Sequence, residues 1–237
     1  MRLYLMRHAD PNPERDGLTP QGVKEAEALA AGLAAEGVTR LYSSVTVRSL
    51  ETAEATARRT GLAVQRLPWL LEPHFLRINQ GGTDYCLWDT FGETVRGVSP
   101  LPGLESWTTH PPFDDPGVRA MWEGFRAQCD VLLASHGYRR EEGRYRIVKR
   151  SAEKLALFSH NGTVLLLLAH LLELPVSLVW SGFYAWPASM TVVHFEEQSE
   201  TWAVPRALCV ADTSFVRMAG LKPVPRGMGT RPFAQWL

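Results

Sequence analysis

The chain has 237 residues, of which 45% are hydrophobic and 21% are charged, a composition typical of a globular protein with a sizeable core. Lys and Arg together number 25, as do Asp and Glu, so no net charge attracts the chain to nucleic acid or to an anionic membrane. These values exclude a disordered or fibrous protein and leave recognition to local groups of charge.

The sequence also carries expectations about the compartment. Its N-terminus lacks the basic region and apolar run of a secretory signal, and its most apolar segment, residues 164–172, is too short to span a bilayer. The three cysteines, Cys86, Cys129 and Cys209, lie far apart and form no CxxC motif, which is typical of a reducing compartment. We therefore expect a cytoplasmic protein whose partners include neither nucleic acid nor a membrane.

The first third of the chain alternates between strands and helices. Apolar runs, a Thr19-Pro20 helix start and the glycines Gly37 and Gly61 predict a strand from residue 2 into the Arg7-His8 pair, strands over 39–44 and 62–67, and helices over 20–36 and 46–60. This β-α-β-α-β order predicts a parallel sheet with right-handed crossovers.

The alternation fails between residues 73 and 150, a segment rich in proline, glycine and aromatic side chains. One helix over residues 116–135 and a hairpin around Glu142-Gly143 are predicted within it. Because a structureless loop of this length is improbable in a compact domain, we interpret the segment as a lid inserted into a single domain over residues 1–237.

The regular pattern returns after residue 150. It predicts a buried strand over 154–159, an apolar helix that ends at 174, a strand over 190–196 and an edge strand over 202–210, before about 25 irregular residues. The predicted fold class is α/β, a three-layer α/β/α sandwich with a mostly parallel central sheet and an inserted lid subdomain.

Side chains suited to phosphate follow three of the predicted strands. Arg7 and His8 end the first strand, Arg48 lies in the first turn after the second, and His160 follows the strand over 154–159. Since the carboxyl ends of parallel strands share one edge of a sheet, we expect these groups to meet there. An imidazole at this edge can act as a nucleophile, and a guanidinium group can hold an oxyanion. The backbone N–H groups near Gly162 begin the next helix and can also donate to an anion.

These residues resemble the motifs of the histidine phosphatase superfamily, also called the phosphoglycerate mutase-like family. The motifs are the Arg-His signature at Arg7 to Asp10, Leu18-Thr19 with Gly22, the pattern from Ser43 to Ala53, Ser159 to Gly162, and Asp212-Thr213-Ser214. They cover residues 1–72 and 151–215 and leave the insertion unexplained. Ala9-Asp10 replaces the family's commonest Gly-Glu, and Asn161 replaces its more usual glycine, which argues against glycolytic mutase activity.

The resemblance implies a phosphatase that hydrolyses phosphomonoesters, in particular small phosphorylated metabolites, through a phosphohistidine on His8. Arg7, Arg48 and His160 would hold the phosphate oxygens and offset the charge of the transition state, so that neither a metal nor another cofactor is needed. Glu72 stands where family members carry an acidic residue after the third strand, and it is implied as the acid that protonates the leaving alcohol.

Several roles stay open at this point. Asp10, Asp89, Glu93 and Glu105 are alternatives to Glu72 as the acid. The remaining candidates for phosphate or substrate contacts are Asn12, Thr19, Asn161 and Gly162. The same motifs fit a phosphomutase, in which a second substrate hydroxyl replaces water, and a phospho-ligand binding module without turnover. The physiological substrate is not defined by the sequence, and a homodimer is compatible with it.

Overall fold

The computed structural model describes residues 1–226, whose secondary structure alternates as predicted in the first third of the chain. The strands are β1 (Arg2–Arg7), β2 (Arg40–Ser43), β3 (Val64–Arg66), β4 (Arg77–Gln80), β5 (Thr83–Cys86), β6 (Tyr138–Glu141), β7 (Arg144–Ile147), β8 (Lys154–Ser159), β9 (Met190–Glu197) and β10 (Trp202–Asp212). The helices are α1 (Pro20–Glu36), α2 (Val47–Thr60), α3 (Gly92–Arg96), α4 (Pro116–Ser135), α5 (Asn161–Leu172), α6 (Val176–Gly182) and α7 (Ser214–Met218), with single 3₁₀ turns η1 (Pro68–Leu70), η2 (Leu87–Asp89) and η3 (Trp107–Thr109).

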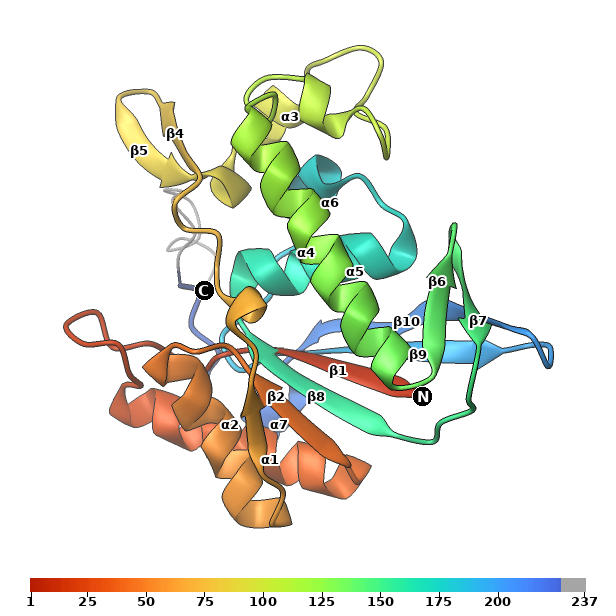
Figure 1. Cartoon of the computed structure of the whole chain (residues 1–237). Coiled ribbons are helices and arrows are strands. Elements are labelled where there is room, and N and C mark those ends of the chain that lie inside the picture. The colour runs from red at the N-terminus through yellow and green to blue at the C-terminus, as the bar shows by residue number, and fades with distance from the viewer. Residues whose placement is uncertain (227–237) are drawn as a thin grey trace.

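The predicted three-layer α/β/α architecture is confirmed. One sheet of eight strands, in the order β3-β2-β8-β1-β9-β10-β7-β6, lies between α1, α2 and α7 on one face and α4, α5 and α6 on the other (Figure 1). Strand β1 shows why both faces are covered: Leu3 and Leu5 belong to the core under α5, whereas Tyr4 and Met6 belong to the core under α1 and α2. Successive side chains of a strand point to opposite faces, so an unbroken apolar run needs helices on both sides.

The sheet is mixed rather than mostly parallel. Strands β3, β2, β8 and β1 pair in parallel, whereas β1-β9, β9-β10, β10-β7 and β7-β6 pair antiparallel. The antiparallel pairs β9-β10 and β6-β7 are joined by short connections, which allow only antiparallel neighbours. The parallel prediction therefore holds for the four strands that the helical crossovers link.

The helices of the parallel half begin and end at the residues that the sequence marks. The Thr19 hydroxyl accepts the Gly22 N–H (2.9 Å) at the start of α1, and Gly37 ends it with a φ of 70°. Gly22 is also required sterically, because a Cβ there would lie 2.3 Å from the Asp10 carbonyl oxygen. The start of α1 is thereby held against the turn that follows β1.

The inserted segment is only partly separate from the main domain. Strands β4 and β5 form a small two-stranded sheet of their own, and α4 packs against the α5 side of the core. The predicted hairpin instead extends the main sheet, because β7 pairs with β10 through Arg146 and Trp202. Strand β10 is consequently an interior strand and not the predicted edge strand. That this segment acts as a lid stays a prediction.

Two boundaries near the C-terminus differ from those predicted. The apolar helix ends at Leu172 rather than at 174, because Glu173 takes the left-handed conformation (φ 54°) and α6 begins after Pro175. The predicted irregular C-terminal stretch contains the short helix α7, and residues 227–237 of it lie outside the described residues. Within residues 1–226, no helix has both the length and the apolar character that crossing a membrane requires.

Candidate active site

The register of the parallel strands brings the two motif histidines together. Arg7 of β1 is paired with Ser159 of β8, so the next residues, His8 and His160, leave the sheet side by side. Their ring centroids are 5.2 Å apart, and both side chains are buried. The predicted convergence at one sheet edge is what the structure shows for these two residues.

His8 is held in one neutral tautomer. Its Nδ1 lies 2.8 Å from the Ala9 carbonyl oxygen, which can only accept, and its Nε2 receives a hydrogen bond from Arg48 Nε at 3.2 Å. Burial, followed by the charges of His160, Arg7 and Arg48, lowers the pKa of His8 well below its ordinary value. The lone pair on Nε2 is therefore present at neutral pH, as a nucleophile requires.

His160 is neutral for the same reasons and carries its proton on the other nitrogen. Arg48 Nη2 lies 3.3 Å from His160 Nδ1, and since a guanidinium group can only donate, Nδ1 must accept. The proton then lies on Nε2, which is 2.9 Å from the Ser44 hydroxyl at the end of β2. Burial, then the charges of Arg48 and Arg7, lowers the pKa of His160 well below its ordinary value.

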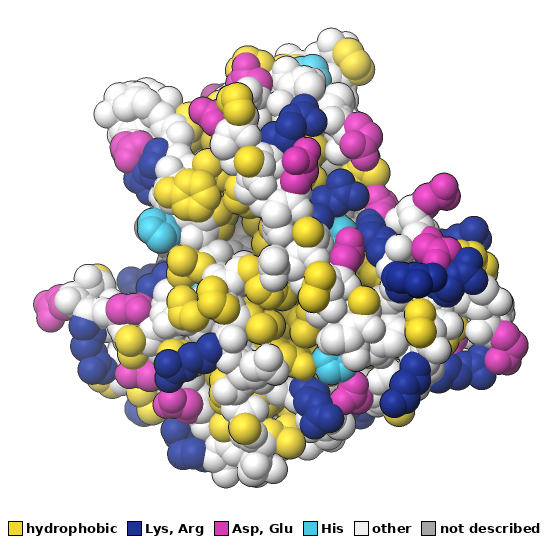
Figure 2. Space-filling view, in the orientation of Figure 1, with side chains coloured by type: hydrophobic (Ala, Val, Ile, Leu, Met, Phe, Trp, Pro, Cys, Tyr) yellow, Lys and Arg dark blue, Asp and Glu magenta, His cyan; other side chains and the backbone are white. Residues whose placement is uncertain are grey.

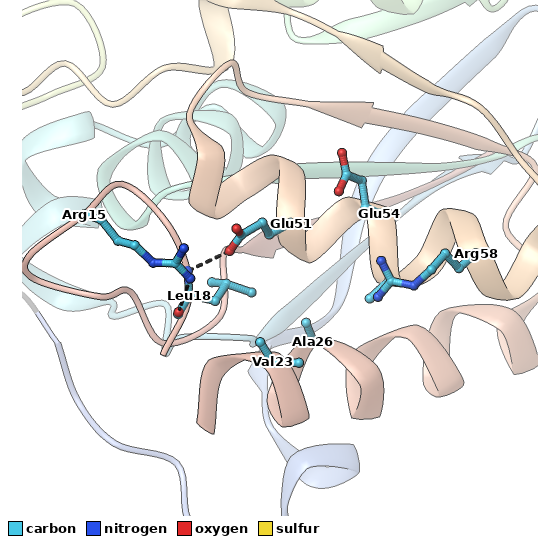
Figure 3. A pocket seen from close by; sticks show the side chains of 8 residues that line it. Arg15, Leu18, Val23, Ala26, Glu51, Glu54 and Arg58 are labelled. Atoms are coloured by element: carbon cyan, nitrogen blue, oxygen red, sulfur yellow. Dashed lines mark hydrogen bonds between the residues drawn. The ribbon is translucent and has the colours of Figure 1, made fainter. Parts of the chain in front are cut away.

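The first turn of α2 fixes Arg48 and the residues after it beside His8. The Thr52 hydroxyl accepts the Ala9 N–H (3.1 Å) and donates to the Arg48 carbonyl (2.8 Å), which fixes the first turn of α2 against the chain beside His8. Glu51 accepts the Leu18 N–H at 2.7 Å (Figure 3). Arg48 itself forms an ion pair at 2.6 Å with Asp16, which lies in the same β1–α1 loop as Leu18.

Arg7 is buried at the floor of the site and held through its two terminal nitrogens. Nη1 donates to the Ala185 carbonyl and Nη2 to the Arg226 carbonyl, each at 2.7 Å, and the Tyr184 ring lies 5.4 Å from the guanidinium carbon. Its Nε is buried and has no hydrogen-bond partner within the described part of the chain. This N–H and the second hydrogens of Nη1 and Nη2 are the donors of Arg7 that the two carbonyls leave for a bound oxyanion.

Glu72 lies beside His160. The segment after β3 is tied down by the Ser159 and Thr163 hydroxyls, which donate to the Leu70 and Leu71 carbonyls. Glu72 Oε1 then accepts the Thr163 N–H (3.2 Å), and Oε2 lies 4.0 Å from His160 Nδ1. Burial raises the pKa of Glu72 to about 7, against the opposing charge of Arg7. A carboxyl group with this pKa can donate a proton near neutral pH.

The structure separates the other carboxylates considered for that role. Burial raises the pKa of Asp89 to about 7, against the opposing charges of Arg7 and Arg77. Asp10 forms an ion pair with Arg226. Glu93 and Glu105 are exposed and make no hydrogen bond or ion pair to the site within residues 1–226. Asp89 is therefore the one of these four whose pKa is raised as far as that of Glu72.

The weaker phosphate-binding candidates have local partners. Asn12 accepts the Glu14 N–H within its own turn, and Thr19 caps α1 and donates to Asp10 at 2.7 Å. Asn161 accepts the Ala185 N–H at 3.0 Å. Gly162 lies beside Glu72, and a Cβ there would come within 2.7 Å of Glu72 Oε1 and 2.9 Å of the Trp88 ring. Each of these residues therefore has a structural role. That they also contact phosphate stays a prediction.

Of three further residues that touch the site, two were not singled out from the sequence, and Ser44 was named only as part of the pattern from Ser43 to Ala53. Ser44 binds His160, Asp16 binds Arg48, and Arg226 binds both Arg7 and Asp10. Ser44 follows directly after β2, at the sheet edge where the sequence pattern placed the end of that strand. Asp16 and Arg226 lie in irregular segments and have no periodic signal.

Two surface hollows lie near these residues. Apolar side chains gather in the middle of the face drawn in Figure 2, where a groove of about 420 Å³ lies between the segment around Glu72 and α4. Its lining includes Trp69, Leu71, Phe75, Met121 and Phe125. A second hollow of about 240 Å³ lies between α1 and α2, with Arg15, Glu51, Glu54 and Arg58 around it (Figure 3). Within residues 1–226, no group of three or more His, Cys, Asp or Glu side chains is arranged to hold a metal ion.

Comparison with known proteins agrees with this geometry. The family model described as histidine phosphatase superfamily (branch 1) matches residues 3–87. Among curated proteins, no sequence matches the chain.

Solved structures share the fold over most of the chain. An Entamoeba histolytica phosphoserine phosphatase is 18% identical, with a TM-score of 0.60 over 91% of this chain and 98% of that one. A mycobacterial glucosyl-3-phosphoglycerate phosphatase is 20% identical, with a TM-score of 0.56 over 91% of this chain and 99% of that one. A mycobacterial hydrolase is 22% identical, with a TM-score of 0.59 over 92% and 96%.

The match of the family model to the segment that holds Arg7, His8, Arg48 and Glu72, together with the shared fold, confirms the resemblance of this chain to the histidine phosphatase superfamily.

Proposed function

We propose that the protein is a phosphatase that hydrolyses small phosphomonoesters through a phosphohistidine on His8. The observation that carries this proposal is the protonation of His8. Its Nδ1–H donates to the Ala9 carbonyl, while Nε2 keeps its lone pair beside the Arg48 guanidinium group. The structures with the same fold include a phosphoserine phosphatase and a glucosyl-3-phosphoglycerate phosphatase. Both are phosphatases, which supports the same class of reaction for this chain.

In the first half of the reaction, His8 Nε2 attacks phosphorus and the P–O bond to the alcohol breaks. Arg7 Nε and the Arg48 guanidinium donate to the phosphoryl oxygens, where their fixed positive charges offset the charge that develops. The leaving alcohol oxygen takes a proton from Glu72, which burial keeps protonated to about pH 7. The products are the free alcohol and His8 carrying the phosphoryl group on Nε2.

In the second half, water replaces the alcohol. Glu72, now a carboxylate, accepts a proton from the attacking water, the N–P bond breaks, and inorganic phosphate leaves with His8 again neutral. The same intermediate would serve a phosphomutase if a second substrate hydroxyl took the place of water. No contact among the described residues favours that acceptor over water, so we propose the hydrolase.

The test is release of inorganic phosphate from p-nitrophenyl phosphate and a panel of phosphorylated metabolites, with EDTA present. We expect His8→Ala to lower kcat/KM by about 10³-fold or more, because the nucleophile is lost. His194→Ala is the matched control, since His194 pairs with Arg2 at the opposite end of β1 from His8. It should retain the wild-type rate.

Equal activity in wild type and His8→Ala would remove His8 from the chemistry and overturn the proposal. If neither releases phosphate, incubation with a labelled phosphodonor separates the alternatives. An acid-labile phosphoryl group on wild type alone would favour the mutase, and no label would favour a binding module.

A further inference from the structure

The segment that follows α7 returns to the site described above. The Lys222 carbonyl accepts a hydrogen bond from Gln21 Nε2 of α1 (3.0 Å), and four residues later the Arg226 side chain reaches Asp10. Arg226 is 216 residues away from Asp10 in the sequence, and its side chain is 48% exposed while that of Asp10 is 4% exposed. A residue at the end of the described chain thus covers the turn that carries His8.

Arg226 balances buried negative charge behind His8. Its Nε and Nη2 donate to the two Asp10 oxygens at 2.6 and 3.3 Å, and the Asp10 N–H in turn donates to the buried carboxylate of Glu25 at 2.9 Å. Burial raises the pKa of Glu25. Within residues 1–226, the contact with Arg226 is the only ion pair made by either carboxylate. Without it, Asp10 would keep a charge in a buried place beside the site, with only hydrogen bonds to offset it.

The backbone of Arg226 holds Arg7 as well. Its carbonyl accepts from Arg7 Nη2 at 2.7 Å, opposite the Ala185 carbonyl on Nη1, and the Tyr184 hydroxyl bonds to both the N–H and the carbonyl of Arg226 at 2.8 Å. Two carbonyls fix the plane of the Arg7 guanidinium group, and its buried Nε has no partner among the described residues. The orientation of Arg7 therefore depends on the place of Arg226.

We propose that Arg226 is a positioning residue of the phosphate site: it neutralises Asp10 through its side chain and orients Arg7 through its carbonyl. The inference rests on the proposed function, because it takes the Arg7 and His8 region as the place where phosphate binds. Arg226 itself stays behind Arg7 and touches no reacting atom. Its loss should weaken phosphate binding more than it slows the chemical step.

The experiment compares Arg226→Ala and Arg226→Lys with wild type, and uses Arg217→Ala as the matched control. Arg217 is an exposed arginine of α7 without an ion pair among the described residues. We expect Arg226→Ala to raise KM for p-nitrophenyl phosphate and the inhibition constant of orthovanadate by about 10-fold or more, with kcat changed much less. Arg226→Lys should recover part of the loss, because a lysine keeps the charge without the two-nitrogen contact. Arg217→Ala should match wild type.

A pair of truncated chains tests the carbonyl contact, which no side-chain substitution removes. A chain that ends at Val224 lacks Arg226 altogether, and a chain that ends at Gly227 keeps its carbonyl as an amide. The shorter chain should have the higher KM of the two and a higher KM than Arg226→Ala. Equal KM in the two truncated chains would remove the carbonyl from the proposal.

The outcomes also separate this inference from the proposed function. If wild type is active, His8→Ala is inactive and Arg226→Ala keeps the wild-type KM and inhibition constant, the positioning role is wrong and the function stands. If wild type releases no phosphate, the function fails, and binding of inorganic phosphate measured by calorimetry decides the inference. Weaker binding by Arg226→Ala than by wild type supports it, whereas equal binding, or no binding by wild type, overturns it.

Discussion

In the parallel half of the sheet, formed by β3, β2, β8 and β1, strands end in side chains that carry charge or lone pairs. In the antiparallel half, three fully buried aromatic side chains pack together: Phe195 lies between Tyr138 and Tyr145, with ring centroids 5.2 and 5.0 Å away. The difference follows from connectivity. Helical crossovers return every parallel strand in the same direction, so their carboxyl ends meet at one edge, whereas hairpins place successive ends at opposite edges.

Substitutions in the two halves of the sheet should therefore have different effects, on catalysis in the parallel half and on stability in the antiparallel half. A change at the ends of β1, β2 or β8 should alter kinetic constants in a protein that still folds. A change inside β7, β9 or β10 should alter the free energy of unfolding and leave the kinetic constants of the folded molecule as they are.

The largest effect is expected from Glu72→Gln, which keeps the size of the side chain and removes its proton. We expect kcat for an alkyl phosphate to fall by about 10²- to 10⁴-fold, the usual contribution of a general acid. Because burial raises the pKa of Glu72 to about 7, wild-type activity should fall as pH rises through that value, and the variant should lose this dependence. A pH profile of kcat for the two proteins checks it. Glu105→Gln, at an exposed position, is the control.

The same proton affects folding stability. The folded pKa of Glu72 is raised above that of the unfolded chain, so the proton's stabilising effect is complete below about pH 4.5 and is lost as pH rises through about 7.

Asp89→Asn tests the rival carboxyl group. If Asp89→Asn abolished the fall of kcat at high pH while Glu72→Gln kept that fall, Asp89 of the inserted segment would be the general acid.

In the antiparallel half, Phe195→Ala should reduce the free energy of unfolding by about 3–5 kcal/mol, because it empties the centre of a fully buried aromatic cluster. Denaturant titration measures this change, and kcat/KM per folded molecule should equal that of wild type. Leu208→Ala on β10 is the matched control, since Leu208 is 52% exposed and its loss should change stability by less than about 0.5 kcal/mol. A large kinetic defect in a folded Phe195→Ala protein would contradict the separation of the two halves.

A smaller effect is expected from Gly162→Ala at the start of α5. The added methyl group would lie 2.7 Å from Glu72 Oε1 and 2.9 Å from the Trp88 ring, so the carboxyl group must move away from the site. We expect kcat to fall by about 10-fold, which corresponds to about 1.4 kcal/mol in the barrier. Gly32→Ala in α1 meets only ordinary contacts near 3.8 Å and should leave kcat unchanged. Unchanged kcat in Gly162→Ala would mean that Glu72 needs no fixed position.

Much of the parallel half could be predicted because its signals are local. The apolar run before Arg7-His8, the capping residue Thr19 and the glycine Gly37 each mark a strand or helix within a few residues of themselves. The strand ends then place His8, Arg48 and His160 together by topology alone. Glu72 was implied by the family resemblance, and its place beside His160 depends on hydrogen bonds from Ser159 and Thr163 to the segment before it.

The rest depends on contacts between distant segments. A hairpin at Glu142-Gly143 can be predicted from the sequence, but its pairing with β10 through Trp202 and Arg146 has no local signal. Strand β10 therefore looked like an edge. The contact between Arg226 and Asp10 is of the same kind, since it joins the two ends of the described chain.

The short outer strands of the mixed sheet have a consequence for behaviour at high concentration. Among residues 1–226, the sheet of eight strands leaves two rows of unpaired backbone groups, on β3 and on β6, which could recruit strands from other molecules. Strand β3 has only three residues, and β6 carries Arg139, Arg140 and Glu141 among its four. The short β3 and the charged β6 both disfavour edge-to-edge pairing between molecules. A large open sheet can in this way avoid aggregation.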